Sequence, residues 1–435
     1  MAGPAPSPEC TAYLDARLID PGSGREMTGG LVVRNGLITD LGPQVTRATA
    51  PRDAAIIRCE GHVLAPGLID CRVFAGEPGH EHKETLDSAS QAAAAGGVTT
   101  MICMPDTDPV IDDVALVDFI ARRARDTATV NIHPMAALTK GLEGRQMTEI
   151  GLLTDAGAVA FTDGKKSVAD PQLLRRALTY ARNFGALVVQ HVEEPSLGSG
   201  GVMNEGLVST RLGLPGIPAA AEIIMLERDL RLVELTGARY HAAQISCRQA
   251  LDAMRAAKKR GLPVTCGASI NHLVLNENDI GSYRTFFKMS PPLRSEDDRQ
   301  SLVEGLADGT LDVIVSDHDP QDQDTKRHPF EEAEFGAIGV ETLLPAALSL
   351  VHNEKIPLMR VLHALTAGPA SVLRLDSGRL EPGAPADLVL IDTETPWQVD
   401  AEKLKSKSKN TPFEDKRFQG YALRTVVGGA SVFTA

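Results

Sequence analysis

Short apolar segments alternate with helical patterns through the middle of this chain of 435 residues. Eight of these segments have the length and composition of buried strands, and a helical stretch such as 173–183 or 218–236 follows most of them. The candidate strands are 63–73, 99–104, 130–138, 158–163, 187–192, 240–246, 263–269 and 312–317. Because this alternation is typical of parallel β/α units, it predicts an α/β fold with a (β/α)₈ TIM barrel.

The two ends of the chain have a different pattern, with short β segments and few helical periods. These β segments are 12–20, 30–42, 386–392 and 423–433. The pair Asn35-Gly36 is a hairpin turn signal within the second of them. We therefore predict a small β domain formed from residues 1–60 and 376–435, beside a barrel that spans 61–375.

The composition excludes several classes of protein. Lys and Arg together number 44 and Asp and Glu 57, so the formal net charge is −13. This balance argues against nucleic acid or an anionic membrane as a partner. The six cysteines form no Cys-x-x-Cys pair and are expected to be buried free thiols of a reducing compartment. With no apolar stretch of membrane-spanning length and no signal-like N-terminus, a cytoplasmic location is predicted.

The first predicted barrel strand ends in the segment Asp70-Cys71-Arg72-Val73-Phe74. Many barrel hydrolases have Asp-x-His-x-His here, because side chains two residues apart point to the same side and both imidazoles reach one metal ion. In this chain the two imidazole positions hold Arg72 and Phe74. Arginine does not lose its proton to become a ligand, and phenylalanine has no lone pair. The residues around these two positions match those of a metal site, but the two imidazole ligands are absent.

Sequence motifs along nearly the whole chain resemble those of the class I dihydroorotases of the amidohydrolase superfamily. They include Pro66-Gly67-Leu68-Ile69-Asp70, Glu77-Pro78-Gly79, Gly96-Gly97-Val98-Thr99-Thr100, Gly213-Leu214-Pro215-Gly216-Ile217-Pro218, Lys288-Met289-Ser290-Pro291-Pro292, Asp317-His318 and Asn410-Thr411-Pro412-Phe413. The resemblance implies the barrel and a β domain from both termini. It also implies one or two Zn²⁺ ions that open and close the dihydroorotate ring in active members.

The zinc ligands that the resemblance implies are mostly absent from this chain. Three of the family's four histidine ligands are replaced, at Arg72, Phe74 and Gln244. The surviving family positions are Asp163, His191 and Asp317, whereas the second aspartate that the resemblance implies beside Asp163 is replaced by Gly164. One histidine and two carboxylates make a poor zinc site, so no metal ligand and no cofactor are expected. If the chain is active, Asp317 is the catalytic residue that the resemblance implies, with zinc as cofactor.

The family's substrate contacts are depleted independently of the metal ligands. The contacts are lost at Gly76, Asp106, Ser290 and Gln321. Asp106 would repel the substrate carboxylate that the family's asparagine binds at this position. No substrate-binding residue is therefore expected, although the glycines and prolines of the scaffold are retained.

These losses together predict a dihydroorotase-like protein of pyrimidine biosynthesis that is catalytically inactive. By the resemblance, such a chain supports assembly or stability of aspartate carbamoyltransferase as a partner of its catalytic chain, and it is expected to be a homo-oligomer. Two alternatives remain. One is an active zinc-dependent dihydroorotase or cyclic amidohydrolase with a rebuilt site. The other is an oligomeric scaffold related to the hydantoinases.

Arg72 has a more specific predicted role. Asp163 and Asp317 are expected to face the emptied site, where buried carboxylates without a cation are costly. We therefore expect the Arg72 guanidinium to pair with one or both of them.

Other residues near the strand ends are given structural roles. One interpretation of His80 and His82 is a rebuilt ligand pair, and one of Lys165 or Lys166 is a carboxylated lysine. For all four residues, solvated side chains are favoured over a role as ligands. His241 is expected to be a hydrogen-bonded core histidine. His318 is interpreted as a hydrogen-bonded remnant beside Asp317, in preference to half of a catalytic pair, and Cys71 is expected to point away from the site.

Overall fold

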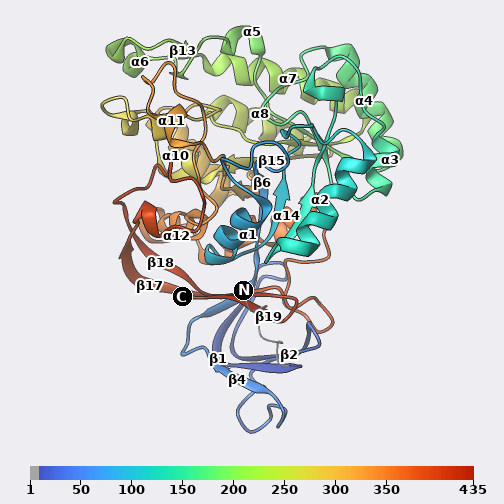
Figure 1. Cartoon of the computed structure of the whole chain (residues 1–435), viewed down its shortest axis with the longest axis vertical. Helices are drawn as coiled ribbons and strands as arrows, with labels where there is room; N and C mark the ends of the chain where they lie inside the picture. The colour runs from blue at the N-terminus through green and yellow to red at the C-terminus, as the bar shows by residue number, and fades with distance from the viewer. Residues whose placement is uncertain (1–8) are drawn as a thin grey trace.

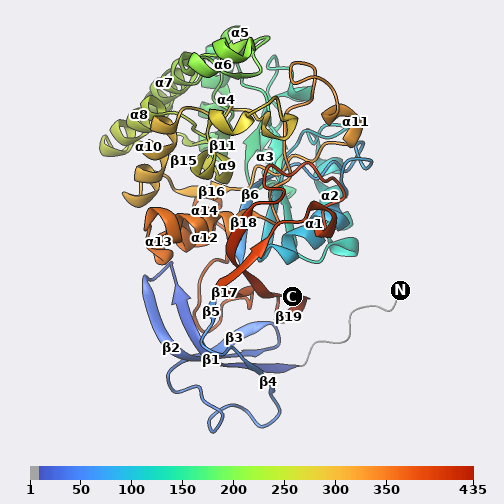
Figure 2. The same cartoon turned by 90° about the vertical axis from the view of Figure 1, so that its left-hand side faces the viewer.

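The computed structural model describes residues 9–435, so the first eight residues of the predicted 1–60 segment lie outside the described part. In Figures 1 and 2 the barrel forms the upper body of the molecule, and the β domain lies below it. Both ends of the described chain belong to the β domain. The predicted fold class is confirmed.

Parallel strands form the barrel and follow one another around it in chain order. They are β6 (Leu68–Val73), β7 (Val98–Cys103), β8 (Asn131–Pro134) with β9 (Ala136–Ala137), β10 (Phe161–Thr162), β11 (Leu187–Gln190), β14 (Arg239–Ala242), β15 (Val264–Ser269) and β16 (Val313–Val315). A parallel bridge between Val73 and His318 brings the last strand back to the first. The carboxyl ends of all these strands therefore meet at one end of the barrel.

Helices cover the outside of the barrel. They are α1 (Leu86–Ala95), α2 (Val114–Thr127), α3 (Ile150–Asp155), α4 (Pro171–Asn183), α7 (Ala219–Thr236), α8 (Arg248–Lys259), α10 (Glu296–Ala307), α12 (Leu343–Glu354) and α13 (Leu358–Leu365). The short helix α14 (Ala367–Leu373) instead packs Val372 and Leu373 against the apolar interior of the barrel. Several begin at side chains that accept a hydrogen bond from the first turn, such as Asp113, Asp170 and Ser295. Proline at position 171 then supplies the preset backbone angle of a first helical residue.

Short elements decorate the end of the barrel where the strands finish. They are α5 (Pro195–Gly198), β12 (Met203–Asn204), α6 (Leu207–Leu212), β13 (Gly216–Ile217), α9 (Ile270–Val274) and α11 (Gln323–Lys326). Strands β12 and β13 pair in parallel as a separate small sheet. These elements and the loops around them frame the strand ends in Figure 1.

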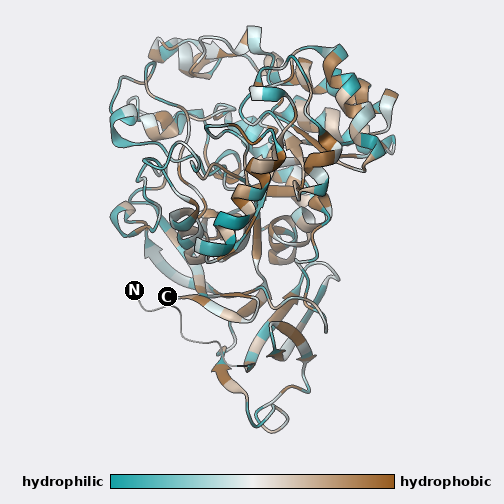
Figure 3. Ribbon diagram, turned by 45° about the vertical axis from the view of Figure 1, so that its right-hand side comes forward, coloured by the Kyte–Doolittle hydropathy of each residue, from teal (hydrophilic) through white to brown (hydrophobic). Residues whose placement is uncertain are grey.

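Two layers of apolar side chains hold the barrel together. One layer fills its interior and includes Ile69, Ile102 and Val189, and the other lies between the strands and the helices. Figure 3 shows this pattern as apolar residues along the barrel strands and polar residues on the outer helix faces. The six cysteines are free and buried, as predicted. Among residues 9–435, no helix combines the length and the apolar character needed to cross a membrane.

One sheet from both termini forms the β domain. Its strands are β1 (Cys10–Asp20), β2 (Arg25–Arg34), β3 (Leu37–Gly42), β4 (Ala55–Arg58), β5 (Val63–Pro66), β17 (Leu388–Gln398), β18 (Arg417–Val427) and β19 (Ala430–Thr434). Strand β17 pairs with β5, which joins the C-terminal strands to the N-terminal ones. The predicted hairpin is confirmed, since Arg34 pairs with Leu37 and both Asn35 and Gly36 have positive φ. The exact domain bounds remain a prediction.

The buried His272 of α9 provides a test of stability against pH. Its Nε2 lies 3.0 Å from the carbonyl oxygen of Pro291 and 3.2 Å from that of Pro292, so it donates to the loop before α10. Burial lowers the pKa of His272 from 6.5 to about 4. The folded state therefore prefers the neutral ring, and stability present above pH 6.5 is lost as the pH falls toward 4.

We expect a His272→Gln variant to lose less stability on acidification than the unsubstituted protein, because glutamine keeps a donor but does not titrate. The difference between the two unfolding free energies should change by about 3 kcal/mol between pH 7 and pH 4. Urea denaturation at a series of pH values measures this difference. Parallel stability curves for the two proteins would show that His272 does not titrate in this range.

Candidate active site at the strand ends

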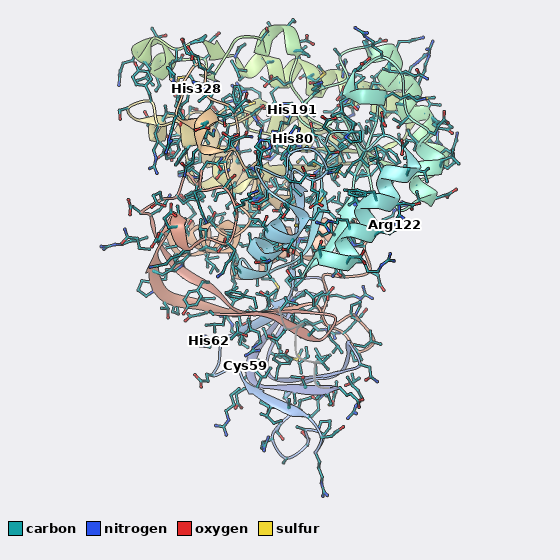
Figure 4. The ribbon with its side chains drawn as sticks, in the orientation of Figure 1. Cys59, His62, His80, Arg122, His191 and His328 are labelled. Carbon is teal, nitrogen blue, oxygen red and sulfur yellow. The ribbon has the colours of Figure 1, made fainter. Side chains whose placement is uncertain are left out.

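The polar residues singled out from the sequence gather at the carboxyl ends of the barrel strands. Arg72 lies at the end of β6, and Asp163 follows β10 directly. His191 follows β11, and Asp317 lies just beyond β16. In Figure 4, His191 lies within the body of the barrel, well away from the labelled residues of the β domain. The strand-end arrangement that the sequence predicts is therefore present.

An ion pair between Arg72 and Asp317 lies at the centre of the site. The Nε atom of Arg72 donates to Oδ1 of Asp317 over 2.9 Å, and the two side chains are 3% and 10% exposed. Burial raises the pKa of Asp317, and the positive charge of Arg72 opposes this effect. Asp317 also has a positive φ of 55°, a conformation that non-glycine residues seldom adopt outside turns and functional sites.

Asp163 has different partners from those expected. It accepts hydrogen bonds from the backbone N–H of Thr139, over 2.8 Å, and from the Thr139 hydroxyl. Burial nevertheless raises the pKa of Asp163 to about 6. The expected pairing of Arg72 therefore forms with Asp317, whereas the ion pairs of the described residues do not join Arg72 to Asp163.

Phe74, which stands at the second lost histidine position, contacts two cations. The guanidinium carbon of Arg72 lies 5.1 Å from the ring centroid, and the Lys165 ammonium lies 4.4 Å from it. Lys165 also forms an ion pair of 2.6 Å with Asp319. We call these five residues, Arg72, Phe74, Lys165, Asp317 and Asp319, the cation cluster. Lys165 is exposed as predicted, but its charge has a fixed partner that the sequence did not indicate.

Several buried polar atoms next to the cation cluster have no hydrogen-bond partner within residues 9–435. They are Nη1 of Arg72, Nδ1 of His191 and Oδ2 of Asp106. Burial lowers the pKa of His191 to about 3, so this imidazole is neutral at physiological pH. Its Nε2 atom lies 3.3 Å from the hydroxyl oxygen of Ser290. Unsatisfied groups of this kind are uncommon in folded proteins and are typical of ligand-binding or catalytic sites.

The side chain of Asp106 packs directly against Gly164. A Cβ atom added to Gly164 would lie 1.7 Å from Oδ2 of Asp106, so the aspartate occupies the space of the missing side chain. Asp106 also accepts a hydrogen bond of 3.2 Å from the backbone N–H of Lys165. The residues at 106 and 164 both differ from the family's pattern, and the contact between them shows that the two differences depend on each other.

The remaining substrate positions also have structural roles. Gly76 has a φ of 72°, and a Cβ there would lie 2.9 Å from the carbonyl oxygens of His80 and Glu84, so this loop leaves no room for an arginine. Gln321 accepts from the Lys83 ammonium over 2.8 Å and donates to Asp319 over 3.0 Å. These contacts tie both positions to the first loop of the barrel.

The other candidate residues behave mostly as structural groups. His82 is exposed and lies 3.7 Å from Asp322. Nδ1 of His241 lies 2.8 Å from the Thr265 hydroxyl oxygen, which confirms a bonded core histidine. Nδ1 of His318 accepts the backbone N–H of Gly339 over 3.2 Å, and its Nε2 lies 3.6 Å from the buried carboxylate of Glu84. Sequence reasoning gave Glu84 no role.

The zinc ions that the resemblance implies do not fit these residues. Among residues 9–435, no three or more His, Cys, Asp or Glu side chains are grouped so that they could hold a metal ion. Arg72 presents a permanent positive charge to Asp317, and the Thr139 bonds occupy Asp163. A divalent cation would have to displace a guanidinium and would find a single neutral imidazole, His191, at the retained family positions.

The contact between Asp106 and Gly164 predicts a coupled response to mutation. We expect Gly164→Ala to destabilise the protein by about 2–3 kcal/mol, because a methyl group meets Asp106 and the backbone has a positive φ. In an Asp106→Ala background the same substitution should cost only about 1 kcal/mol, the backbone part alone. Chemical denaturation of the four proteins measures both values.

Gly213→Ala is a matched control, since Gly213 has a φ of 70° and no atom within 4 Å of an added Cβ. Its cost should be about 1 kcal/mol in both backgrounds. Equal costs of Gly164→Ala with and without Asp106 would contradict the coupling.

Curated relatives match nearly the whole chain. Residues 61–250 match the Dihydro-orotase-like family and residues 349–433 the Amidohydrolase family. A protein named Dihydroorotase from Anaplasma phagocytophilum is 45% identical over 98% of this chain and 95% of its own length. Proteins of the same name from Wolbachia of Drosophila simulans and from Solibacter usitatus are 41% and 42% identical over 97% and 95% of this chain, and 95% and 96% of their own lengths.

Solved structures support the fold. An L-hydantoinase from Arthrobacter aurescens superposes with a TM-score of 0.86 at 23% identity, over 97% of this chain and 95% of its own. A dihydropyrimidinase from Brevibacillus agri gives a TM-score of 0.84 at 20% identity, over 98% of this chain and 95% of its own. At this level of identity the likeness establishes the barrel with its terminal β domain.

The comparisons correct the prediction that the chain is not an enzyme. That prediction relied on the histidines replaced at Arg72, Phe74 and Gln244, but relatives that are 40–45% identical over almost the full length are named Dihydroorotase, which points to an enzyme. Lost ligand positions describe one part of the site, whereas the likeness extends over the entire scaffold. Because these relatives match it over almost its full length, this chain belongs to the dihydroorotase family.

Proposed function

We propose that this chain is a dihydroorotase of pyrimidine biosynthesis, which opens and closes the cyclic amide that joins dihydroorotate and N-carbamoyl-aspartate. The observation that carries the proposal is the 45% identity to a dihydroorotase over 98% of the chain. The strand-end site adds support, because buried polar groups without partners converge there. Since zinc does not fit these residues, the proposal assigns the chemistry to side chains of the chain itself.

Ring opening requires a base, a positive charge and a proton donor. Water adds to the amide carbonyl carbon, negative charge develops on the carbonyl oxygen, and the carbon–nitrogen bond then breaks while the nitrogen takes up a proton. Asp317 is the proposed base, because burial raises the pKa of its carboxyl group and so strengthens the carboxylate as a proton acceptor. The same carboxyl group would return the proton to the nitrogen.

Arg72 is the proposed source of positive charge. Its Nε donates to Asp317, and its buried Nη1 has no partner among the described residues, so we assign Nη1 as the donor to the carbonyl oxygen of the substrate. A fixed N–H donor in a site that excludes water stabilises developing negative charge much more than it would in solvent. This assignment gives the two residues of the ion pair separate tasks.

We expect the purified protein to interconvert dihydroorotate and N-carbamoyl-aspartate, and Asp317→Asn to lower kcat by roughly 100-fold or more, because asparagine cannot accept the proton. Ultraviolet absorbance of the ring follows both directions. Asp308→Asn is the control, since Asp308 pairs with Arg255 on the surface and should retain full activity. Folded protein without turnover in either direction would overturn the proposed function.

Association with an aspartate carbamoyltransferase catalytic chain is a second part of the proposal, on the strength of the family resemblance. Exposed apolar side chains support a protein partner at this end of the barrel, where Leu207 of α6 is 73% exposed and Ile224 of α7 is 51% exposed. Both helices lie at the top of Figure 1, away from the β domain. A protein partner that covered these two helices would remove both apolar side chains from water.

We expect the two chains to co-elute in size-exclusion chromatography and Leu207→Ser with Ile224→Ser to weaken the complex, because the substitutions remove apolar contact area. Leu152→Ser is a control, since Leu152 is 59% exposed on α3, elsewhere on the barrel. Separate elution of the unsubstituted chains at micromolar concentration would contradict this association.

A further inference from the structure

The proposed reaction does not explain how the charges of the cation cluster are balanced. In the dihydroorotase resemblance, zinc supplies the positive charge that offsets carboxylates at the strand ends. Here the Asp317 side chain is 10% exposed and the Asp319 side chain 9% exposed, and zinc does not fit. Asp163 and Asp106 accept hydrogen bonds from Thr139 and from the Lys165 backbone. Asp317 and Asp319 without a cation would strongly destabilise the fold, so the structure has to compensate for these two in another way.

Each of these carboxylates has its own resident cation. Arg72 pairs with Asp317 over 2.9 Å, and Lys165 pairs with Asp319 over 2.6 Å. The two carboxylates come from one loop after β16, whereas the cations come from the ends of β6 and β10. Positive charge is therefore delivered to the strand ends from two separate strands.

Phe74 allows the two cations to lie in the same small region. Both approach its ring, at 5.1 Å for the guanidinium carbon and 4.4 Å for the ammonium nitrogen. The face of an aromatic ring attracts cations and needs no hydrogen bond from them, so their donors stay available to the carboxylates. A histidine at position 74 could become protonated beside Arg72, whereas phenylalanine cannot.

We propose that Arg72, Phe74 and Lys165 form a built-in cation centre that takes the electrostatic place of the zinc ions, so that the barrel is complete and stable without metal. The proposal goes beyond the proposed function, because it concerns the charge at the barrel centre whether or not the chain turns over dihydroorotate. Its tests measure stability and metal content, and their failure is distinguishable from failure of the enzyme assay.

A double-mutant cycle tests the ion pair at the heart of the centre. We expect Arg72→Met and Asp317→Asn each to lower Tm by roughly 3–5 °C, because each leaves a buried partner without its counterpart. The double variant should lose much less than the sum of the two shifts, because it removes both groups. Arg72→Lys, which keeps the charge, should lie between the unsubstituted protein and Arg72→Met.

The surface pair of Arg255 and Asp308, at 2.7 Å, is the matched control for this cycle. Arg255→Met and Asp308→Asn should each shift Tm by no more than about 1 °C and add together. Additive losses at Arg72 and Asp317 would overturn the proposal.

Metal content supplies an independent measurement that requires no variant to fold. Protein produced in zinc-supplemented medium should contain much less than one zinc per chain by mass spectrometry of the metals. Its Tm should be unchanged by a chelator and by added zinc. About one tightly held zinc per chain, with a Tm that falls on chelation, would overturn the proposal.

Discussion

The ion pair between Arg72 and Asp317 connects the first and last strands of the barrel. A buried carboxylate is tolerated when an opposite charge reaches it, and here that charge comes from the strand that the closing bridge at Val73 and His318 already brings alongside. Closure of the barrel and neutralisation of its centre therefore depend on the same pair of strands. The backbone N–H of Phe74, which donates to the carbonyl of His318 over 2.9 Å, strengthens this connection.

The family to which this chain belongs and the residues at its strand ends lead to different expectations for the chemistry of the site. Identity of 45% with a dihydroorotase extends over the scaffold, while the strand ends hold a guanidinium and an aromatic ring at positions where a metal-dependent relative would have imidazoles. The proposed function joins the two by giving proton transfer to Asp317 and charge stabilisation to Arg72. The ligand losses alone predict a noncatalytic protein, because they concern a few strand-end positions and not the scaffold over which the relatives named Dihydroorotase match.

The sequence predicted what depends on local pattern and missed what depends on long-range contact. Strand periodicity located the barrel strands, and Asn35-Gly36 located a hairpin, because both signals lie within a few residues. The sequence predicts that Arg72 pairs with Asp163, Asp317 or both, since the barrel places all three at strand ends, and the pair forms with Asp317. The bonds from Thr139 to Asp163, and the meeting of Lys165 with Asp319 and Phe74, join loops whose conformations no short pattern specifies.

The fit of Asp106 against Gly164 restricts the order in which substitutions can occur. While Asp106 fills that space, an aspartate at 164 requires the Asp106 carboxylate to turn away, which breaks its hydrogen bond from the backbone N–H of Lys165 and places two negative charges side by side. An asparagine at position 106 would keep the size of the side chain and remove one of the two negative charges, so it makes a later aspartate at 164 easier. A stepwise return to the family's usual arrangement is therefore easier when position 106 changes before position 164.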